Sequence, residues 1–232
     1  MIQKNMQRQY FHVSPHGLCR QVVAGCVLAL VVLGSAPGCT THQIHGTVQQ
    51  RAISLKQGEL QTYGLAFITP STVTGQEEDK QALALTFAEV LVAERPAVRV
   101  VTLPETLGAI NRAGLAEKYK VMYEDYRDTG IFKRDILRKV GEATGTRYLV
   151  QLKLASFLQG SQNRWGFLGI RMLDTKSASI RLFLQIWDSE DGTIAWEGNE
   201  ELNYAFDTSR ERAVTFKTVV ETTARNLIAH LP

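Results

Sequence analysis

The fold is decided by residues 178–196, whose sequence is ASIRLFLQIWDSEDGTIAW. Asp191-Gly192 supplies the positive φ angles that a tight hairpin turn requires. Before this turn, hydrophobic side chains alternate with polar ones, which is the two-residue period of a strand with one buried face. The hydrophobic members are Ile180, Leu182, Leu184 and Ile186. The pattern predicts a β-hairpin whose second strand covers 193–206.

A further strand is predicted just before this hairpin. Residues 146–157, TRYLVQLKLASF, show the same alternation. Residues 158–177 contain three glycines among mixed polar residues, and they predict either a long loop or a bent arm of the hairpin. The chain from 146 to 206 is therefore expected to be rich in β-structure.

Aromatic residues gather in this β-rich half. Trp187 and Trp196 flank the turn, and we expect them to lie near each other and to pack in the core, where aromatic cross-strand pairs contribute about 0.2–1 kcal/mol each. Trp165 and Phe167 lie in the segment with the glycines. Because aromatic residues are enriched at binding hot spots, Trp165 and Phe167 are the candidates for a partner-binding surface, with packing as the alternative.

The preceding part of the chain alternates short strands with helices. Strands are predicted from short apolar runs, and helices where apolar residues recur every three or four positions. The strands cover 63–69 and 98–102, the helices about 78–94, 104–112 and 132–144, and a tyrosine-rich, partly exposed helical stretch covers 116–130. The predicted architecture is an α/β (α+β) sandwich, one mixed β-sheet with packed helices, in the order β-α-β-α-α-β-β-β-α.

Local signals mark several helix ends. A capping box pairs a Thr with a Glu three residues later, and each side chain satisfies a backbone amide at the start of a helix. Such pairs are Thr102 with Glu105 and Thr208 with Glu211. Gly145 suits the left-handed conformation that ends a helix. The last helix is accordingly predicted from about 209 to 230.

The N-terminus has the layout of an export signal. A polar, basic stretch is followed by an apolar run of about a dozen residues, Val22–Leu33, and then by small residues up to Cys39. This run is shorter than the about 20 residues that span a bilayer. Ala36-Pro37-Gly38-Cys39 resembles the lipobox of bacterial lipoproteins, which implies cleavage before Cys39 and lipidation of its thiol. The alternative is an ordinary signal peptide with a chance cysteine behind it.

Charges and cysteines fit removal of this leader. Lys4, Arg8 and Arg20 are its charged residues, so the remaining chain carries 23 basic and 23 acidic residues. A net-neutral domain gives no electrostatic reason to bind nucleic acid. Cys19 and Cys26 leave with the leader, so Cys39 remains without a disulfide partner.

Three parts of the chain follow from these patterns: a signal peptide at 1–38, a lipidated flexible tether at 39–60 and a periplasmic α/β domain at 61–232. The tether is polar and shows no sustained apolar period. It holds His42 and His45, which we interpret as solvated rather than as metal ligands, because no further ligands stand nearby.

Several of these stretches together resemble the CsgG/LpoB-like group of periplasmic lipoproteins. The matching pieces are LAFITPSTVTG (65–75), GEATGTRYLVQL (141–152) and IRLFLQIWDSEDGTIAW (180–196). The likeness covers about residues 63–205. Thr146-Arg147 stands where the group has a small residue followed by an acidic one. The resemblance implies a non-catalytic domain that acts by contact, and the absence of Asp after Cys39 implies sorting to the outer membrane.

Enzyme motifs are absent from the sequence. It has no G-x-S-x-G, H-E-x-x-H, Walker A or G-x-G-x-x-G motif, and the predicted domain has His230, near the C-terminus, as its single histidine. Glu77-Glu78 and Glu200-Glu201 are paired carboxylates, which we interpret as charged surface. Glu200 and Glu201 would point to opposite faces of a strand. No catalytic residue, cofactor or metal is predicted.

The resulting hypothesis is a lipoprotein held on the periplasmic face of a Gram-negative outer membrane by the lipid on Cys39. It would bind another cell-envelope protein, either as a regulator of a cell-wall synthase or as a component of an envelope complex. The alternative is a subunit of an outer-membrane secretion pore similar to the curli secretion channel. Association with further copies of itself is compatible with either role.

Overall fold

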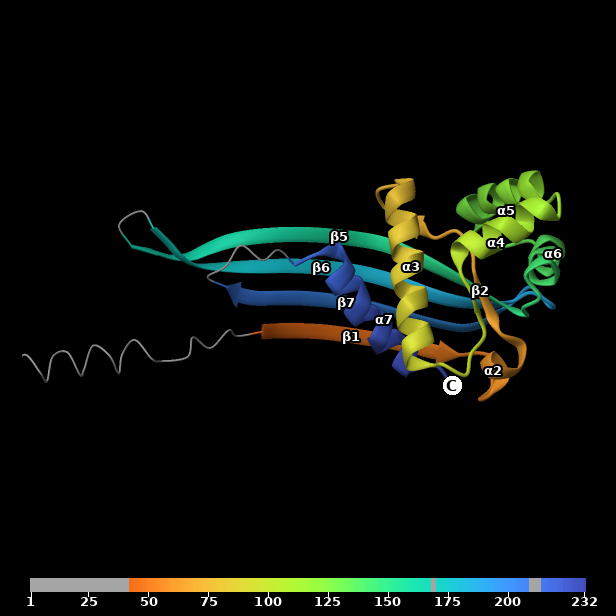
Figure 1. The fold of residues 1–232 in the computed structure, drawn as a ribbon, viewed down its shortest axis with the longest axis horizontal. Helices are drawn as coiled ribbons and strands as arrows, with labels where there is room; N and C mark the ends of the chain where they lie inside the picture. The colour runs from red at the N-terminus through yellow and green to blue at the C-terminus, as the bar shows by residue number, and fades with distance from the viewer. Residues whose placement is uncertain (1–41, 168–169, 209–213) are drawn as a thin grey trace, which may run out of the picture. The chain divides into compact units, whose positions relative to one another are not determined.

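The computed structural model describes residues 42–167, 170–208 and 214–232. Within these ranges the strands form one mixed sheet in the order β1-β7-β6-β5-β2-β4, with β3 paired to β5 (Figure 1). The strands are β1 (His42–Ala52), β2 (Leu65–Phe67), β3 (Ser71–Thr72), β4 (Val100–Val101), β5 (Tyr148–Phe167), β6 (Ile170–Asp188) and β7 (Ile194–Thr208). The helices are α2 (Glu59–Tyr63), α3 (Glu77–Glu94), α4 (Leu103–Arg112), α5 (Ala116–Thr129), α6 (Arg134–Thr144) and α7 (Phe216–Ala229). The predicted α/β sandwich is confirmed.

The predicted element order is incomplete. Three helices separate β4 from β5 where that order counts two, but the helical stretch predicted at 116–130 is confirmed as α5, and β1, α2 and β3 are additional elements. The last two of these are very short, so they carry no periodic pattern that sequence reasoning could detect. The long β5-β6-β7 meander is antiparallel throughout, whereas β2 pairs in parallel with both β4 and β5.

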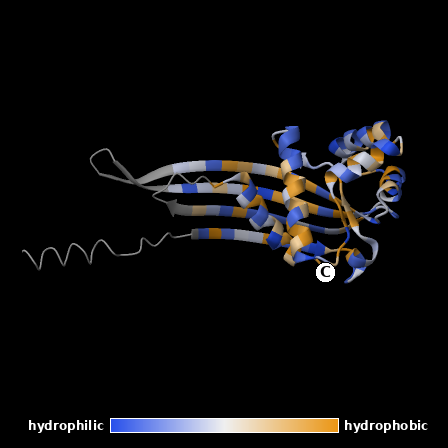
Figure 2. Cartoon of the chain, viewed as in Figure 1, coloured by the Kyte–Doolittle hydropathy of each residue, from blue (hydrophilic) through white to orange (hydrophobic). Residues whose placement is uncertain are grey.

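Two hydrophobic clusters lie on opposite faces of the sheet. The larger one packs α3 and α7 against the strands and includes Trp196. The smaller one lies under α4, α5 and α6 and includes Trp187. In Figure 2 the hydrophobic residues gather in α3 and in the strand segments that it crosses. The sheet is therefore covered on both faces near its short parallel strands.

The two tryptophans of the hairpin are buried, as predicted, but they do not meet. A register irregularity between Ile186 and Trp187 places Ile186 opposite Trp196 and Trp187 opposite Ile194. Trp196 is fully buried in the larger cluster, while Trp187 is 4% exposed in the smaller one. The expected contact between them is wrong, because side chains one strand position apart in register point to opposite faces.

The helix-end predictions have mixed outcomes. The capping box of Thr102 and Glu105 is present at the start of α4, and Gly145 ends α6 at a φ of 65°. The second capping box is wrong at its first residue, because Thr208 lies in β7. Helix α7 starts at Phe216, where the side chain of Thr215 accepts a hydrogen bond from the amide of Thr218. Residues 209–213, where the helix was expected to begin, lie outside the described residues.

The expectation of a flexible tether is wrong for residues 42–52. They form β1, which pairs in antiparallel register with β7 from His42 opposite Phe206 to Ala52 opposite Trp196. Such a strand is held by backbone hydrogen bonds, and its side chains are mostly exposed. Its polar sequence therefore shows no apolar period, although it forms an edge of the sheet.

Residues 158–167 and 170–177 form the two paired strands of a hairpin arm, which is one of the two predicted alternatives. The backbone of Trp165 lies opposite Leu173, and that of Phe167 opposite Ile170. The side chains of Trp165 and Phe167 lie outside the described part of the structure. Among the described residues, no helix has the length and apolar character to cross a membrane.

Candidate functional site

A cleft of about 690 Å³ opens where β2 ends and β3 begins. Ligands of open α/β sheets commonly bind beyond the carboxyl ends of parallel strands, and this cleft has that position. Its walls come from the loop between β2 and α3, from the start of α3, from α5 and from β5. The lining residues are Thr69, Pro70, Ser71, Thr72, Gly75, Lys80, Lys120, Tyr123, Glu124, Tyr126, Arg127, Gly130 and Lys153.

A chain of hydrogen bonds forms the floor of this cleft. The amide of Thr69 donates to the Tyr119 hydroxyl at 2.9 Å, which donates to the Tyr123 hydroxyl at 3.3 Å. Tyr123 donates to Oε1 of Gln151 at 3.2 Å, and Nε2 of Gln151 donates to Oγ of Ser71 at 3.2 Å. This hydrogen-bond network starts and ends between β2 and α3, at Thr69 and Ser71, and passes through α5 and β5, so it fixes the side chains that it joins.

The direction of donation along this series of hydrogen bonds follows from the chemistry of the groups that it joins. Nε2 of Gln151 also lies 3.3 Å from the carbonyl oxygen of Leu152, which can only accept, so the amide orientation is set. Burial raises the pKa of Tyr123 well above its ordinary value and raises that of Tyr119, so both phenols keep their protons as donors. Ser71 accepts at the end of the chain, and its own proton has no acceptor among the described residues.

Cationic side chains surround this floor. Lys80, Lys120, Arg127 and Lys153 line the cleft, against the single carboxylate of Glu124. Lys80 lies 3.4 Å from Glu77, and Arg127 lies 3.2 Å from Asp128. Lys120 and Lys153 have no carboxylate partner within the described ranges. The cleft therefore presents positive charge and hydroxyl donors.

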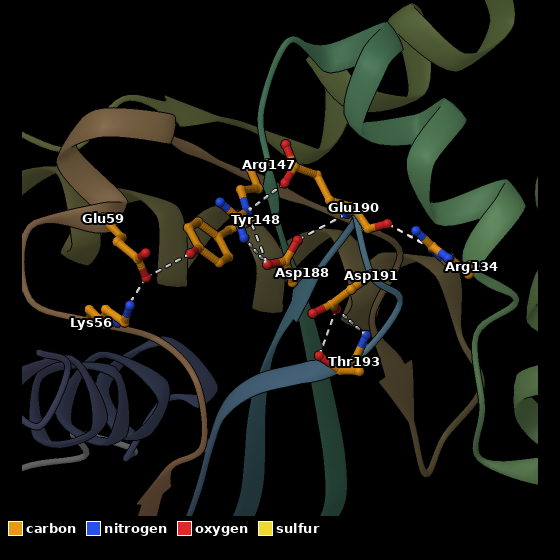
Figure 3. A network of polar contacts seen from close by, with 9 residues as sticks. All are labelled: Lys56, Glu59, Arg134, Arg147, Tyr148, Asp188, Glu190, Asp191 and Thr193. Atoms are coloured by element: carbon orange, nitrogen blue, oxygen red, sulfur yellow. Dashed lines mark hydrogen bonds and ion pairs between the residues drawn. The ribbon is translucent and has the colours of Figure 1, made fainter.

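A second polar cluster lies at the turn between β6 and β7 (Figure 3). Asp188 is almost fully buried, and its Oδ2 accepts from Nε and Nη2 of Arg147 at 2.9 and 2.6 Å. The same guanidinium stands 5.1 Å from the ring centre of Tyr63 and 5.6 Å from that of Tyr148. The hydrogen bonds that Arg147 donates to Asp188 raise the pKa of Arg147. This arrangement explains why an arginine occupies position 147.

The cluster continues from Tyr148 to the start of α2. The Tyr148 hydroxyl donates to Oε2 of Glu59 at 2.9 Å, and the amide of Lys56 donates to the same oxygen at 2.8 Å. These two hydrogen bonds lower the pKa of Glu59, with the backbone amide of Lys56 as the larger cause. Because every member of the cluster is engaged with another, we assign it a structural role: it fastens α2 and the hairpin turn to β5.

Glu200 corrects one sequence-based interpretation. Glu201 is exposed, as predicted, but Glu200 is fully buried, so it is not charged surface. Its Oε1 accepts from Nδ2 of Asn226 at 2.6 Å, and its Oε2 has no hydrogen-bond partner among the described residues. Burial raises the pKa of Glu200, and this outweighs the lowering effects of Asn226 and His230. A Cβ on Gly46 would lie 2.6 Å from Oε1, so β1 closes directly over this carboxyl group.

The structure does not test the sequence-predicted site residues. Cys39 lies outside the described residues, as do the side chains of Trp165 and Phe167. In the part of the chain that is described, no three His, Cys, Asp or Glu side chains are placed to hold a metal ion. The cleft was missed, although the spacing of Tyr119, Tyr123 and Tyr126 on one face of α5 was a usable signal.

Comparison with known proteins finds solved structures that resemble this one, but no match by sequence. No protein-family model matches the chain, and no curated protein matches it. Its structure is similar to that of a PelC dodecamer subunit from Paraburkholderia phytofirmans, with a TM-score of 0.48, 11% identity, and coverage of 81% of this chain and 97% of that one.

Two further structures show weaker likeness. Lipoprotein GNA1162 from Neisseria meningitidis has a TM-score of 0.35 and 13% identity, over 72% of this chain and 98% of that one. The C-terminal domain of LpoB from Salmonella enterica has a TM-score of 0.34 and 12% identity, over 62% and 95%. One of these similar structures is LpoB, which gives its name to the group that the sequence resembles, at 12% identity. The role of this chain has to be sought in its own residues.

Proposed function

We propose that this protein is a lipid-anchored, non-catalytic binding module that docks another cell-envelope protein through the cleft between β3 and α5. The observation that carries the proposal is the hydrogen-bonded floor of the cleft, which runs from Thr69 to Ser71. A floor that is fixed before binding lowers the entropy cost of association. The cleft lining offers donors and cations, and it contains no histidine or cysteine that could act as general base or nucleophile.

The anchor in this proposal is the lipid on Cys39. Thr40 and Thr41 alone separate this cysteine from His42, the first residue of β1. Three extended residues span at most about 11 Å. An acylated Cys39 would therefore hold the start of β1 close to the membrane surface, and the protein would act on partners near that membrane.

A second candidate is a subunit of an outer-membrane secretion pore. The observation that favours it is the length of β5, β6 and β7, which have 20, 19 and 15 residues. A transmembrane strand of a pore needs about 9–11 residues. Native gels of outer-membrane extracts in mild detergent distinguish the two: a ring-sized species that resists dissociation supports the pore, and a single-chain species supports the binding module.

The docking proposal is tested by photo-crosslinking in intact cell envelopes. A photoreactive amino acid replaces Glu124, which lines the cleft, and in a control it replaces Lys118, which is exposed on α5 but does not line the cleft. We expect one defined protein adduct from position 124 and none from position 118. Equal adducts from both positions, or none from either, would contradict the proposal.

A further inference from the structure

We propose that the cleft recognises an acidic peptide segment, whose carboxylates are bound by Lys120, Lys153 and the Ser71 hydroxyl. This inference rests on the proposed docking function and adds the chemistry of the partner. It starts from an imbalance of charge: the lining has four cationic side chains and one carboxylate, and although Lys80 and Arg127 have neighbouring carboxylates, Lys120 and Lys153 have none among the described residues. Like charges gathered around one opening repel each other, and a bound anion removes this cost.

The Ser71 hydroxyl is the directional part of the site. It accepts from Nε2 of Gln151, and Gln151 is 1% exposed and hydrogen-bonded to Tyr123. Since each group upstream in the chain already donates to the next, the Ser71 proton is the one left to donate. The Ser71 hydroxyl is half-buried and has no acceptor among the described residues, so an acceptor from outside the protein is its best complement. A carboxylate is such an acceptor, and it also carries the charge that the cations require.

Sheet pairing brings a cation beside this donor. Ser71 of β3 pairs in parallel with Lys153 of β5. Side chains of paired residues on neighbouring strands stand on the same face of the sheet. Lys153 therefore rises on the same side as Ser71, where it can form a charge-assisted contact with the carboxylate that accepts from Ser71. Lys153 is exposed and has no carboxylate partner among the described residues.

The spacing of the remaining cations favours a chain of carboxylates over one small anion. Lys120 and Arg127 are seven residues apart on α5, which is about 10.5 Å along the helix axis. Alternate residues of an extended peptide are about 6.6 Å apart, so one acidic segment can reach both positions, whereas a single phosphate cannot. A cleft of about 690 Å³ is also large enough for several peptide residues.

The test is binding of a fluorescein-labelled hexaglutamate peptide to the purified full-length protein, measured by anisotropy. Hexaglutamine of the same length is the matched neutral probe. We expect hexaglutamate to bind at least about tenfold more tightly, with an affinity that falls as salt is added. Lys120→Glu and Lys153→Glu should each weaken it about tenfold, and Ser71→Ala about fivefold.

Lys118→Glu is the matched control for Lys120→Glu. Both lysines are exposed on α5, but they are two residues apart and so lie on different sides of the helix. We expect Lys118→Glu to leave hexaglutamate affinity unchanged. Equal losses from both variants would overturn the proposal, as would equal binding of the two peptides. Circular dichroism confirms that each variant is folded.

Two competitors decide between anion classes. Inorganic phosphate or an oligomeric polyuronate that displaces the labelled peptide better than unlabelled hexaglutamate does would also overturn the proposal. The result of this peptide-binding test can be distinguished from the result of the crosslinking test of the docking function. If hexaglutamate fails to bind while position 124 still gives a defined adduct in envelopes, the acidic segment is wrong and docking stands; if both fail, both proposals fall.

Discussion

Arg147 and Asp188 show how one residue choice secures the closed end of the hairpin. Asp188 lies at the last position of β6, and one of its oxygens also accepts the amide of Glu190 at 2.9 Å. The buried carboxylate depends on Arg147 for its neutralising charge. Removing one partner of a buried pair leaves an uncompensated charge, which costs more than the intact pair contributes.

We therefore predict that Arg147→Ala lowers the free energy of unfolding by about 2–3 kcal/mol, measured by urea denaturation. Arg138→Ala is the control, because Arg138 and Glu142 form an exposed pair across one helical turn, and such pairs contribute under about 0.5 kcal/mol. The double variant Arg147→Met with Asp188→Leu should recover part of the loss. If Arg147→Ala left the free energy of unfolding unchanged, the ion pair of Arg147 and Asp188 would not be needed for stability.

Glu200 gives a residue-scale prediction with a defined sign. Its folded pKa is raised above the ordinary value of 4.5, mainly by burial. The folded state then binds the proton more tightly than the unfolded chain, so stability falls as the pH rises from about 4.5 through the raised pKa. Glu200→Gln imitates the protonated form. It should be about 1 kcal/mol more stable than the wild type at neutral pH, and this advantage should shrink toward pH 4.5.

Thermal unfolding between pH 4 and 8 measures this effect. Glu201→Gln is the neighbouring control, because Glu201 is exposed and pairs with Arg181, and we expect little change in its pH profile. A Glu200→Gln protein that is less stable than the wild type at pH 7 would contradict the prediction. One feature of the sequence could have predicted that Glu200 is buried. Glu200 is an even number of positions from the core residues Trp196 and Leu202, so all three side chains lie on the same face of β7.

At the scale of elements, the predictable parts are those with their own periodic signal. The hairpin strands, α3 and α6 have such signals, and the bounds of both helices and of the strand ends at the hairpin turn were found closely, whereas β6 begins eight residues before its predicted start. β1 has none, because its side chains face solvent and its pairing is a property of the backbone. The cleft was missed for a related reason: Ser71 and Lys153 are distant in sequence and become neighbours only through the pairing of β3 with β5.

Proline substitutions in β1 test whether this segment is a strand or a tether. In an antiparallel edge strand, successive N–H groups point alternately toward the neighbouring strand and toward solvent. We predict that, of Gln49→Pro and Gln50→Pro, one lowers the free energy of unfolding by at least about 1 kcal/mol more than the other, through a lost hydrogen bond to β7. A flexible tether would tolerate both equally, and two neutral substitutions would contradict the pairing of β1 with β7.

For the whole molecule, fold class followed from the order of strand and helix signals, whereas the binding surface did not. The sheet has two covered faces because α3 and α7 pack on one side and α4 to α6 on the other. The cleft forms beside this second group, where the walls come from α3, α5, β5 and one loop. No single segment carries the signature of a site assembled in this way.

In the proposed function, a lipid on Cys39 would set where the whole molecule acts. One acyl chain gives only marginal membrane binding, so stable anchoring requires at least two lipid signals. In cells fed an alkyne analogue of palmitate, we expect the wild-type protein to be labelled and to lack residues 1–38 by mass spectrometry. Cys39→Ser should lose the label and retain the leader, whereas Cys19→Ser and Cys26→Ser should match the wild type, because those cysteines leave with the leader. A mature chain with an unmodified thiol at Cys39 would refute the anchor, and with it the inference that β1 begins within about 11 Å of a membrane.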